Sequence, residues 1–232
     1  MATKGRTVPV SSLSAEQKSI MFDLMRKYYE NVTTDEFERD LERKDLVILI
    51  ENDGQLVGFS TQVLFDHQHQ GSQIKVLFSG DTIIEKQHWN TMALPLAWGR
   101  LMLDYCDQYK EHDIYWLLTS KGYKTYRFLP VFFKEYYPHC EVETPEVIDE
   151  LIDSLGSQFF ADRYDTGSMI LRAAGLKQKL TAGVADIDER KLKDKHISYF
   201  NKINPGHIHG DELIAVAKCS KENITSFIAR RL

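Results

Sequence analysis

The chain has 232 residues, 43% apolar and 27% charged, which is the balance of an ordinary globular protein of about one generous domain. Its net charge of −5 argues against nucleic acid as the main partner, because a phosphate-binding surface usually carries a basic excess. Its three cysteines form no CxxC pair, which is typical of a reduced, intracellular protein. The first residues hold no apolar signal segment, and no stretch of about 18 apolar residues follows, so we expect a cytoplasmic protein without a membrane partner.

Two helices are predicted at the start of the chain. Ser14 is placed to cap a helix from about Ala15 to Tyr29, where apolar residues recur at helical spacing. Thr33 and Glu36 form a capping box for a second helix that ends near Glu42.

Three antiparallel strands are expected next. The runs LVILIE and QLVGFSTQVLF flank Asn52-Asp53-Gly54, and an Asp-Gly pair between apolar runs is typical of a β-hairpin turn. The polar stretch Asp66–Ser72 is predicted to connect this hairpin to a third strand, QIKVLFSGDT.

A crossover unit follows. The segment Thr91–Tyr109 has a helical apolar stripe, with Pro95 in its first turn, and it leads into the strand DIYWLLT. A helix between two strands of one sheet makes them parallel, so this strand should run parallel to the one before it. The run KGYKTYRFLPVFFKEYYP is predicted to be another helix.

The last third of the chain is expected to add helices and late strands. Thr144-Pro145 opens an amphipathic helix, whose apolar face either packs on the sheet or lines a site for a larger acyl chain or for the acceptor. Further elements are predicted as a strand near Ser168–Ala173, a helix near Asp188–Asn201, a strand at Glu212–Lys218 and a helix from Glu222. The fold class is therefore α/β (α+β) with one mixed sheet. We expect a single domain over residues 1–232, with a core at about 15–140 and an extension at 141–232 that completes the sheet.

This order of elements resembles the GNAT (Gcn5-related N-acetyltransferase) superfamily. The resemblance covers about Ala15 to Tyr137, with the local matches ENDGQLVGFSTQV and KVLFSGDTII. It implies a mostly antiparallel sheet flanked by helices, in which a central pair of strands splays apart. The resulting slot holds the pantetheine arm of coenzyme A, whose amides bond to the strand edge as an added strand would.

The glycine signature that binds the cofactor pyrophosphate in that superfamily, Q/R-x-x-G-x-G/A, is missing. Two registers fit the residues present: Gln87 with Asn90 and Met92, or His88 with Thr91 and Ala93. Neither supplies a glycine, so a divergent member is implied. Asn90 or Thr91 could still cap the helix and leave N–H groups for an anion.

The resemblance implies acetyl-CoA or a longer acyl-CoA as the donor. Lys121, Lys124 and Arg127 form a local positive group suited to its phosphates. The residues expected to bind the cofactor are Ile83, Ile84, Gln87, Asn90, Thr91, Thr119, Lys121 and Lys124.

A carboxylate near the end of the splayed strand is implied as the base that takes the amine proton. Glu85 is the preferred candidate, because it follows the apolar Ile83-Ile84 and partial burial would raise its pKa. Asp81 and His88 are the alternatives.

A tyrosine is implied as the acid that protonates the departing thiolate. Tyr126 stands seven residues after Thr119, which occupies the place of the superfamily's asparagine. A competing alignment puts Phe133 at the tyrosine place and removes the acid.

No metal is expected. The pairs His67/His69 and His207/His209 lie in predicted loops, and no Cys or third His stands at ligand spacing from them. Cys140 follows a helix end, and no base that could activate it is visible in the sequence.

The sequence therefore predicts an acyltransferase that moves an acyl group from acyl-CoA, or another pantetheine carrier, to the amine of a small molecule by direct attack. Two alternatives remain. One is an enzyme similar to acyl-homoserine-lactone synthases, which accept acyl groups from acyl-carrier protein. The other is a non-catalytic GNAT-like module that binds a ligand or a partner.

Overall fold

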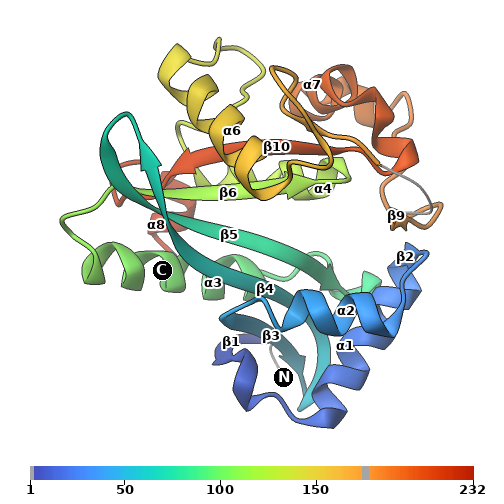
Figure 1. Cartoon of the computed structure of the whole chain (residues 1–232). Helices are drawn as coiled ribbons and strands as arrows, with labels where there is room; N and C mark the ends of the chain where they lie inside the picture. Colours follow the sequence, from blue (N-terminus) through green and yellow to red (C-terminus); the bar gives the residue numbers. More distant parts are fainter. Residues whose placement is uncertain (1–2, 174–177) are drawn as a thin grey trace.

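The computed structural model describes residues 3–173 and 178–232 (Figure 1). Within them a mixed sheet of eight strands organises the chain. From one edge to the other the strands are β1 (Lys4–Pro9), β3 (Leu46–Asn52), β4 (Gln55–His69), β5 (Ser72–Ile84), β6 (Ile114–Ser120), β10 (Glu212–Lys218), β8 (Ile170–Leu171) and β7 (Tyr164–Asp165). All neighbours are antiparallel except β5 and β6, which are parallel. The mostly antiparallel mixed sheet confirms the predicted fold class.

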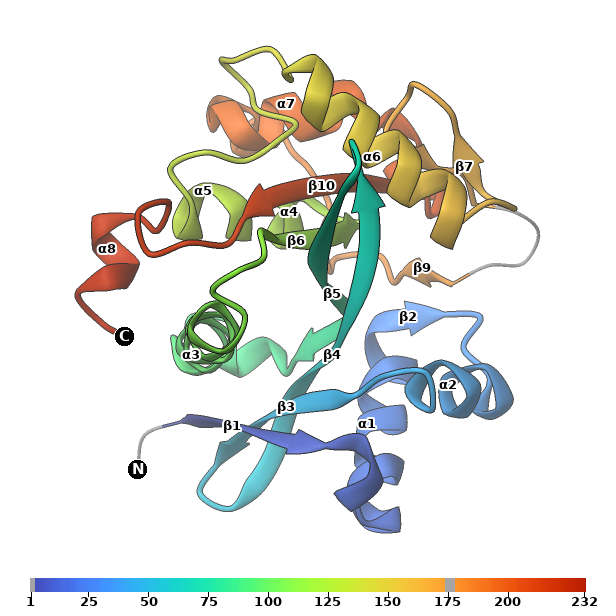
Figure 2. The same cartoon turned by 60° about the vertical axis from the view of Figure 1, so that its left-hand side comes forward.

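Helices cover both faces of this sheet (Figure 2). They are α1 (Ala15–Tyr28), α2 (Thr34–Leu41), α3 (Ala93–Gln108), α4 (Tyr123–Tyr126), α5 (Phe128–Phe132), α6 (Glu146–Phe159), α7 (Lys195–Ile203) and α8 (Ser226–Ala229). Short 3-10 turns occupy Val10–Ser12, Lys86–His88, Lys191–Lys193 and Pro205–His209, and a separate pair of two-residue strands joins β2 (Tyr29–Glu30) to β9 (Lys179–Leu180). None of the helices in the described ranges combines the length and apolar character needed to cross a membrane.

Three apolar clusters hold the layers together. The largest lies under α3, where Trp98 packs against Trp116 of β6 with ring centroids 4.3 Å apart. A second cluster joins α1 and α2 to the other face of β3 and β4. A third joins α6 to β5, β6 and β10 on that same face, through Leu151 and Leu155. The amphipathic helix from Glu146 is therefore a packing element, because its apolar face is buried on the sheet.

The central parallel strands β5 and β6 are paired along only part of their length. β5 and β6 pair from Lys75 and Ile114 to Ser79 and Leu118. Beyond that point β5 stays paired with β4 as far as Ile84, whereas β6 stays paired with β10. The two strands therefore leave a gap with unpaired edges, as the resemblance implies.

Several predicted boundaries are confirmed. Asp53 and Gly54 have φ of 50° and 80° and close the first hairpin. The late strand spans Glu212–Lys218 as predicted, and Pro95 lies in the first turn of α3. Backbone conformations at positive φ suit a tight hairpin turn because they match the twist of the strands.

The prediction of a connecting loop at Asp66–Ser72 is wrong. β4 and β5 run through it as one long hairpin, turned at Gln70 and Gly71 with φ of 48° and 77°. The polar side chains of this stretch are typical of a loop, but α6 covers part of the hairpin, and a strand covered in this way need not alternate regularly between polar and apolar residues. His67 is buried and contacts Ser154 of α6, so it lies in a strand and not in a loop.

The predicted helix after Gly122 is also wrong in part, because it breaks into α4 and α5. Pro130 has no N–H, and in a continuous helix its ring would clash with the carbonyl group of Tyr126. The helix predicted near Asp188–Asn201 is also interrupted, because α7 begins only at Lys195. The side chain of Asp194 caps α7 by accepting from the N–H groups of His196 and Ile197. The edge strand β1 was not predicted.

Candidate active site

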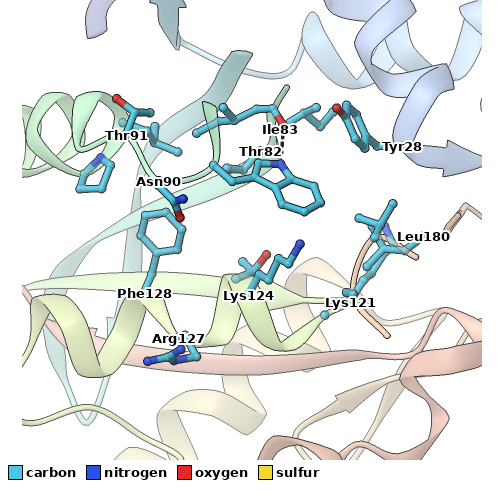
Figure 3. Close-up of a pocket in the computed structure, with 18 of the residues that line it drawn as sticks. Tyr28, Thr82, Ile83, Asn90, Thr91, Lys121, Lys124, Arg127, Phe128 and Leu180 are labelled. Carbon is cyan, nitrogen blue, oxygen red and sulfur yellow. Dashed lines mark hydrogen bonds between the residues drawn. The ribbon is translucent and has the colours of Figure 1, made fainter. Parts of the chain in front are cut away.

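A cavity of about 540 Å³ opens on the α3 side of the gap between β5 and β6. Figure 3 shows its two walls: Asn90 and Thr91 come from the segment before α3, and Lys121, Lys124 and Phe128 come from the opposite side. We call this the donor cavity. Its further lining is mostly apolar: Ile83, Ile84, Trp89, Met92, Leu94, Pro95, Val131, Leu180, Val184 and Ala185.

The β5 edge offers backbone donors to this cavity. The N–H of Glu85 donates to the carbonyl of Val57 in β4, and backbone groups alternate in direction along a strand. The peptide groups of Ile84 and Thr82 therefore face the gap. The indole N–H of Trp89 donates to the Ile84 carbonyl oxygen at 2.7 Å, which agrees with this direction.

Lys124 supplies positive charge at the wall of the donor cavity. Its ammonium lies 3.0 Å from the centroid of the Trp89 ring. Burial, helped by the nearby Lys191 and Lys86, lowers the pKa of Lys124 to about 8. The ammonium groups of Lys124, Lys191 and Lys86 repel one another. An anion bound at this wall would be favoured, because it would offset that repulsion. Arg127 is held at the edge by Asp194, 3.3 Å away.

The start of α3 is a poor anion site. The hydroxyl oxygen of Thr91 accepts from the N–H of Ala93, and Pro95 has no N–H to give. In the first turn of α3, at most the N–H of Leu94 is therefore left to bind an anion. A glycine-rich loop would offer several backbone N–H groups at this place. The N-cap residue is Met92, without a side-chain cap, so neither Asn90 nor Thr91 caps α3 as predicted. Thr91 only accepts the N–H of Ala93 from the position before the cap.

A second cavity, of about 340 Å³, opens on the other side of the gap, where α2 and the end of α6 cover the sheet. We call it the acceptor cavity. It shares Tyr29, Thr82, Lys121 and Thr125 with the donor cavity. Its charged lining consists of Glu36, Asp40, Lys44, Asp81, Lys121, Arg163 and Glu212.

The pKa values of two carboxyl groups in the acceptor cavity are shifted in opposite directions. Burial, with repulsion from Asp40, raises the pKa of Asp81 to about 6, although Lys121 and Lys44 oppose the shift. The pKa of Glu212 is lowered, because Lys121 and Arg163 outweigh the effect of its burial. Arg163 contacts the Glu212 carboxylate at 2.7 Å. Glu212 is thus a fixed anion, and Asp81 is a carboxylate that exchanges a proton near neutral pH.

The structure brings many of the predicted site residues together at the gap. Ile83, Ile84, Asn90, Thr91, Lys121 and Lys124 line the donor cavity, and Asp81, Thr119 and Lys121 line the acceptor cavity. Within the described residues, Glu85, Gln87, His88 and Tyr126 line neither cavity.

Glu85, the preferred base, is engaged elsewhere. Its carboxylate accepts from Lys27 at 2.6 Å and from the hydroxyl of Tyr28 at 2.8 Å. These contacts lower the pKa of Glu85 despite partial burial. A carboxylate so held is a weak base and lies outside both cavities, whereas the alternative candidate Asp81 lines the acceptor cavity.

Tyr126, the predicted acid, is fully buried under α7. Its hydroxyl donates to the carbonyl oxygen of Pro138 at 2.9 Å, and its ring packs against Phe200. The hydroxyl therefore points away from the gap, so the geometry does not support a role as the acid.

Comparison with known proteins gives similarity in structure only. No family model matches the chain, and no curated protein matches it. Solved structures do match: a probable N-acyltransferase of unknown function from Enterococcus faecalis (TM-score 0.44, 16% identity, 57% of this chain and 33% of that chain), a GCN5-related N-acetyltransferase from Kribbella flavida (0.42, 11%, 58% and 34%) and the N-myristoyltransferase of Saccharomyces cerevisiae (0.39, 15%, 52% and 29%). The chain spans about a third of the length of each of these proteins.

The mostly antiparallel sheet flanked by helices and the parted β5–β6 pair are those that the resemblance implies. The fold is GNAT-like. The matches are partial and remote, so they bear on the fold and not on the function of the chain.

Several residues at the GNAT-like gap were not predicted. Tyr29 follows directly on α1 and lines both cavities, while Lys44 and Arg163 reach the acceptor cavity from distant segments. The segment that carries Leu180 and Ala185 crosses Gly122 so closely that a Cβ there would lie 2.9 Å from each. No local pattern marks these residues, because only the fold brings their segments together.

Proposed function

We propose that this protein transfers an acyl group from a pantetheine thioester, acyl-CoA in the first place, to the amine of a small polar molecule. The observation that carries the proposal is the meeting of two cavities at the gap between β5 and β6, where they share Tyr29, Thr82, Lys121 and Thr125. A thioester in the apolar donor cavity would present its carbonyl carbon at this junction. An amine in the charged acceptor cavity would approach it from the other side of the sheet.

The chemistry would use groups at the junction. Asp81 takes a proton from the ammonium, and the free amine attacks the thioester carbonyl carbon. The N–H groups of Thr82 and Ile84, which face the gap, are placed to donate to the oxyanion. The attacking nitrogen then loses its second proton to solvent, the C–S bond breaks and the neutral amide leaves with the acyl group. The departing thiolate takes a proton from an acid at the junction, which balances the reaction.

Tyr29 is our candidate for the group that protonates the thiolate. It lines both cavities, and burial together with Asp81 and Glu212 raises the pKa of its phenol. It therefore stays protonated at neutral pH and can donate to a thiolate, whose conjugate thiol has a pKa of roughly 8.5.

Acyl transfer is tested by a screen of amines against acetyl-CoA and a longer acyl-CoA, with release of free thiol as the readout. We expect thiol release that depends on both the protein and the amine, with the acylated amine detected by mass. If the full set of amine classes gives only background thiol release with donor bound, the proposed reaction is wrong and a binding module remains.

Replacing Tyr29 with Phe should lower turnover by about tenfold, since a thiolate is already a fair leaving group and acid catalysis adds the rest. Donor affinity should not change. Tyr126→Phe is the matched control, because it removes a buried hydroxyl outside both cavities. It should leave turnover unchanged and cost about 1 kcal/mol of stability. Equal losses of turnover in the two variants would remove Tyr29 from the mechanism.

Lys124→Met should weaken acyl-CoA binding by about tenfold or more, the expected effect of losing one charged hydrogen bond to phosphate. A bound anion favours the ammonium form, so wild-type affinity should fall as the pH rises through about 8, the pKa of Lys124 in the free protein. The variant should lack this pH dependence. Calorimetric titrations at pH values on either side of this pKa measure the affinity of the wild type and of the variant for acyl-CoA. An identical pH dependence in both proteins would exclude Lys124 from phosphate binding.

An acyl-carrier protein is a second candidate donor. The observation in its favour is the weak anion site at the start of α3, where Thr91 and Pro95 leave few N–H groups for the pyrophosphate of coenzyme A. A carrier protein would present the same pantetheine arm without that pyrophosphate. Turnover compared with both donors carrying the same acyl group distinguishes the two.

A further inference from the structure

A cluster of metal-binding side chains lies outside both cavities, between the segment after α5 and the first turn of α7. His139, Cys140 and Glu141 each offer a ligand atom, and these atoms lie within 4.8 Å of one another. His196 joins them from α7: its Nδ1 lies 3.4 Å from the Cys140 Sγ. The ring centroids of His139 and His196 are 6.3 Å apart, and the ring planes meet at 74°.

The distances suit a shared tetrahedral ion. Zinc binds imidazole nitrogen at about 2.0–2.1 Å and thiolate at about 2.3 Å, so two such ligands lie roughly 3.5 Å apart. The Cys140 to His196 separation already has this value. The ligand atoms of His139, Cys140 and Glu141, which lie within 4.8 Å of one another, need to approach by about 1 Å, which side-chain rotation in a partly exposed loop can supply. His196 is held next to Cys140, and its side chain must turn with them to complete the set.

The histidine nitrogens are available in the required form. The Nδ1 of His139 accepts from the N–H of Glu141 at 3.1 Å, so this nitrogen carries a lone pair and not a proton. The Nδ1 of His196 faces the hydroxyl of Tyr136 at 3.1 Å. An ion would take the place of the Glu141 N–H on His139, and it would bind His196 through Nδ1 in the tautomer that leaves this nitrogen unprotonated.

We propose that His139, Cys140 and His196 bind a zinc ion, with the carboxylate of Glu141 as the fourth ligand. Two imidazoles, a thiolate and a carboxylate form a borderline-soft set that suits tetrahedral zinc better than magnesium or calcium. Cys140 gives its thiol proton to solvent when the ion binds. Lys195, which holds Glu141 at 2.6 Å, is the outer partner that orients this carboxylate.

The site is structural. It joins the segment after α5 to α7, which packs on Tyr126 through Phe200. Asp194, two residues before His196, pairs with Arg127 at the edge of the donor cavity. The ion would thus fix α7, and with it one border of the donor cavity, without touching the reacting atoms.

The test is metal binding by the tag-free, full-length chain after removal of bound metal with a chelator. Titration with zinc against a chromophoric competitor should give one equivalent of tight binding. Cobalt should give tetrahedral visible bands and a thiolate-to-cobalt band in the near ultraviolet. Cys140→Ser should abolish the thiolate band and weaken zinc binding by at least about a hundredfold, and His139→Gln should weaken it by at least about tenfold.

Matched controls come from the same chain. Cys106→Ser removes another partly buried free thiol, and His209→Ala removes an exposed histidine, and both should bind zinc as the wild type does. If Cys140→Ser does not fold, the wild-type cobalt spectrum with Cys106→Ser still identifies the thiolate. Wild-type binding no tighter than that of His139→Gln, or a cobalt spectrum without a thiolate band, overturns the proposal.

Discussion

Asp81→Asn should lower the rate of acyl transfer by about a hundredfold or more while it makes the protein more stable. The loss of rate follows because an amide cannot accept the ammonium proton, and a positioned base contributes about 10²–10⁴ to the rate. In the wild type the rate should fall as the pH drops below about 6, the pKa of Asp81, since the protonated carboxyl is not a base.

The gain in stability follows from the sign of the same shift. The pKa of Asp81 is about 6 in the folded protein and about 3.9 in an unfolded chain, so ionisation of Asp81 disfavours folding. The penalty is absent below about pH 4, grows between the two pKa values and is complete above about pH 6. After a discount for its partial exposure, removing the charge should add about 1–2 kcal/mol at pH 7 and almost nothing at pH 4.

Rate profiles and thermal unfolding of the wild type and Asp81→Asn over pH 4–8 measure both effects. Asp66→Asn is the matched control, because Asp66 is exposed, pairs with Lys75 and lies far along β4 from the gap. Asp66→Asn should change neither the rate of acyl transfer nor the dependence of that rate on pH. A variant with normal turnover, or one destabilised at pH 7, would exclude Asp81 as a buried base.

Glu212→Gln should produce the largest loss of stability among the charged residues of the site, about 3 kcal/mol at neutral pH. Glu212 is buried and lies between Arg163 and Lys121, 2.7 and 3.5 Å from its carboxylate. The amide would leave two cations close together with no anion between them. Their repulsion and lost hydrogen bonds are what destabilises the variant.

The loss should depend on pH in a stated direction. Because the pKa of Glu212 is lowered on folding, its ion pair stabilises the protein above the unfolded pKa of about 4.3. That contribution is lost as the pH falls through the folded pKa. The difference in unfolding free energy between wild type and variant should therefore shrink in acid.

Denaturant unfolding at neutral pH and at about pH 3–4 measures this difference. Glu51→Gln is the control, because its ion pair with Arg6 at 2.8 Å is largely exposed. It should cost less than about 1 kcal/mol. Equal losses in the two variants would mean that the Arg163–Glu212–Lys121 group is no more important than a surface ion pair.

Local patterns predicted most of the fold. The Asp53-Gly54 turn, the apolar stripe of α3 and the strand Glu212–Lys218 each carry their signal within a few residues. The long hairpin at His67 was missed, because its polarity follows from α6 packing across it, a contact 87 residues away in sequence.

Much of the donor cavity could be predicted, whereas of the acceptor cavity only Asp81, Thr119 and Lys121 were. Asn90, Thr91, Lys121 and Lys124 were identified because they flank the central strands in sequence. The acceptor cavity depends on Glu36, Lys44, Arg163 and Glu212, which only the fold brings together.

The choice between Glu85 and Asp81 as the base depended on partners that the sequence does not reveal. Lys27 and Tyr28, 58 and 57 residues away from Glu85, hold its carboxylate outside the gap. Asp81 lies in the acceptor cavity beside Asp40 and Lys121, where desolvation of its carboxylate raises its pKa toward neutrality. Burial of Glu85 alone, on which the prediction depended, was outweighed by direct ion pairing.

The central claim is that the gap between β5 and β6 binds a pantetheine thioester. Calorimetric titration of the purified chain with acetyl-CoA, a longer acyl-CoA and an acylated carrier protein tests it most directly. The predicted result is saturable one-to-one binding of at least one donor, with a rise in melting temperature and a clear weakening when Lys124 is replaced with Met. Absence of saturable binding with all three donors would contradict the claim.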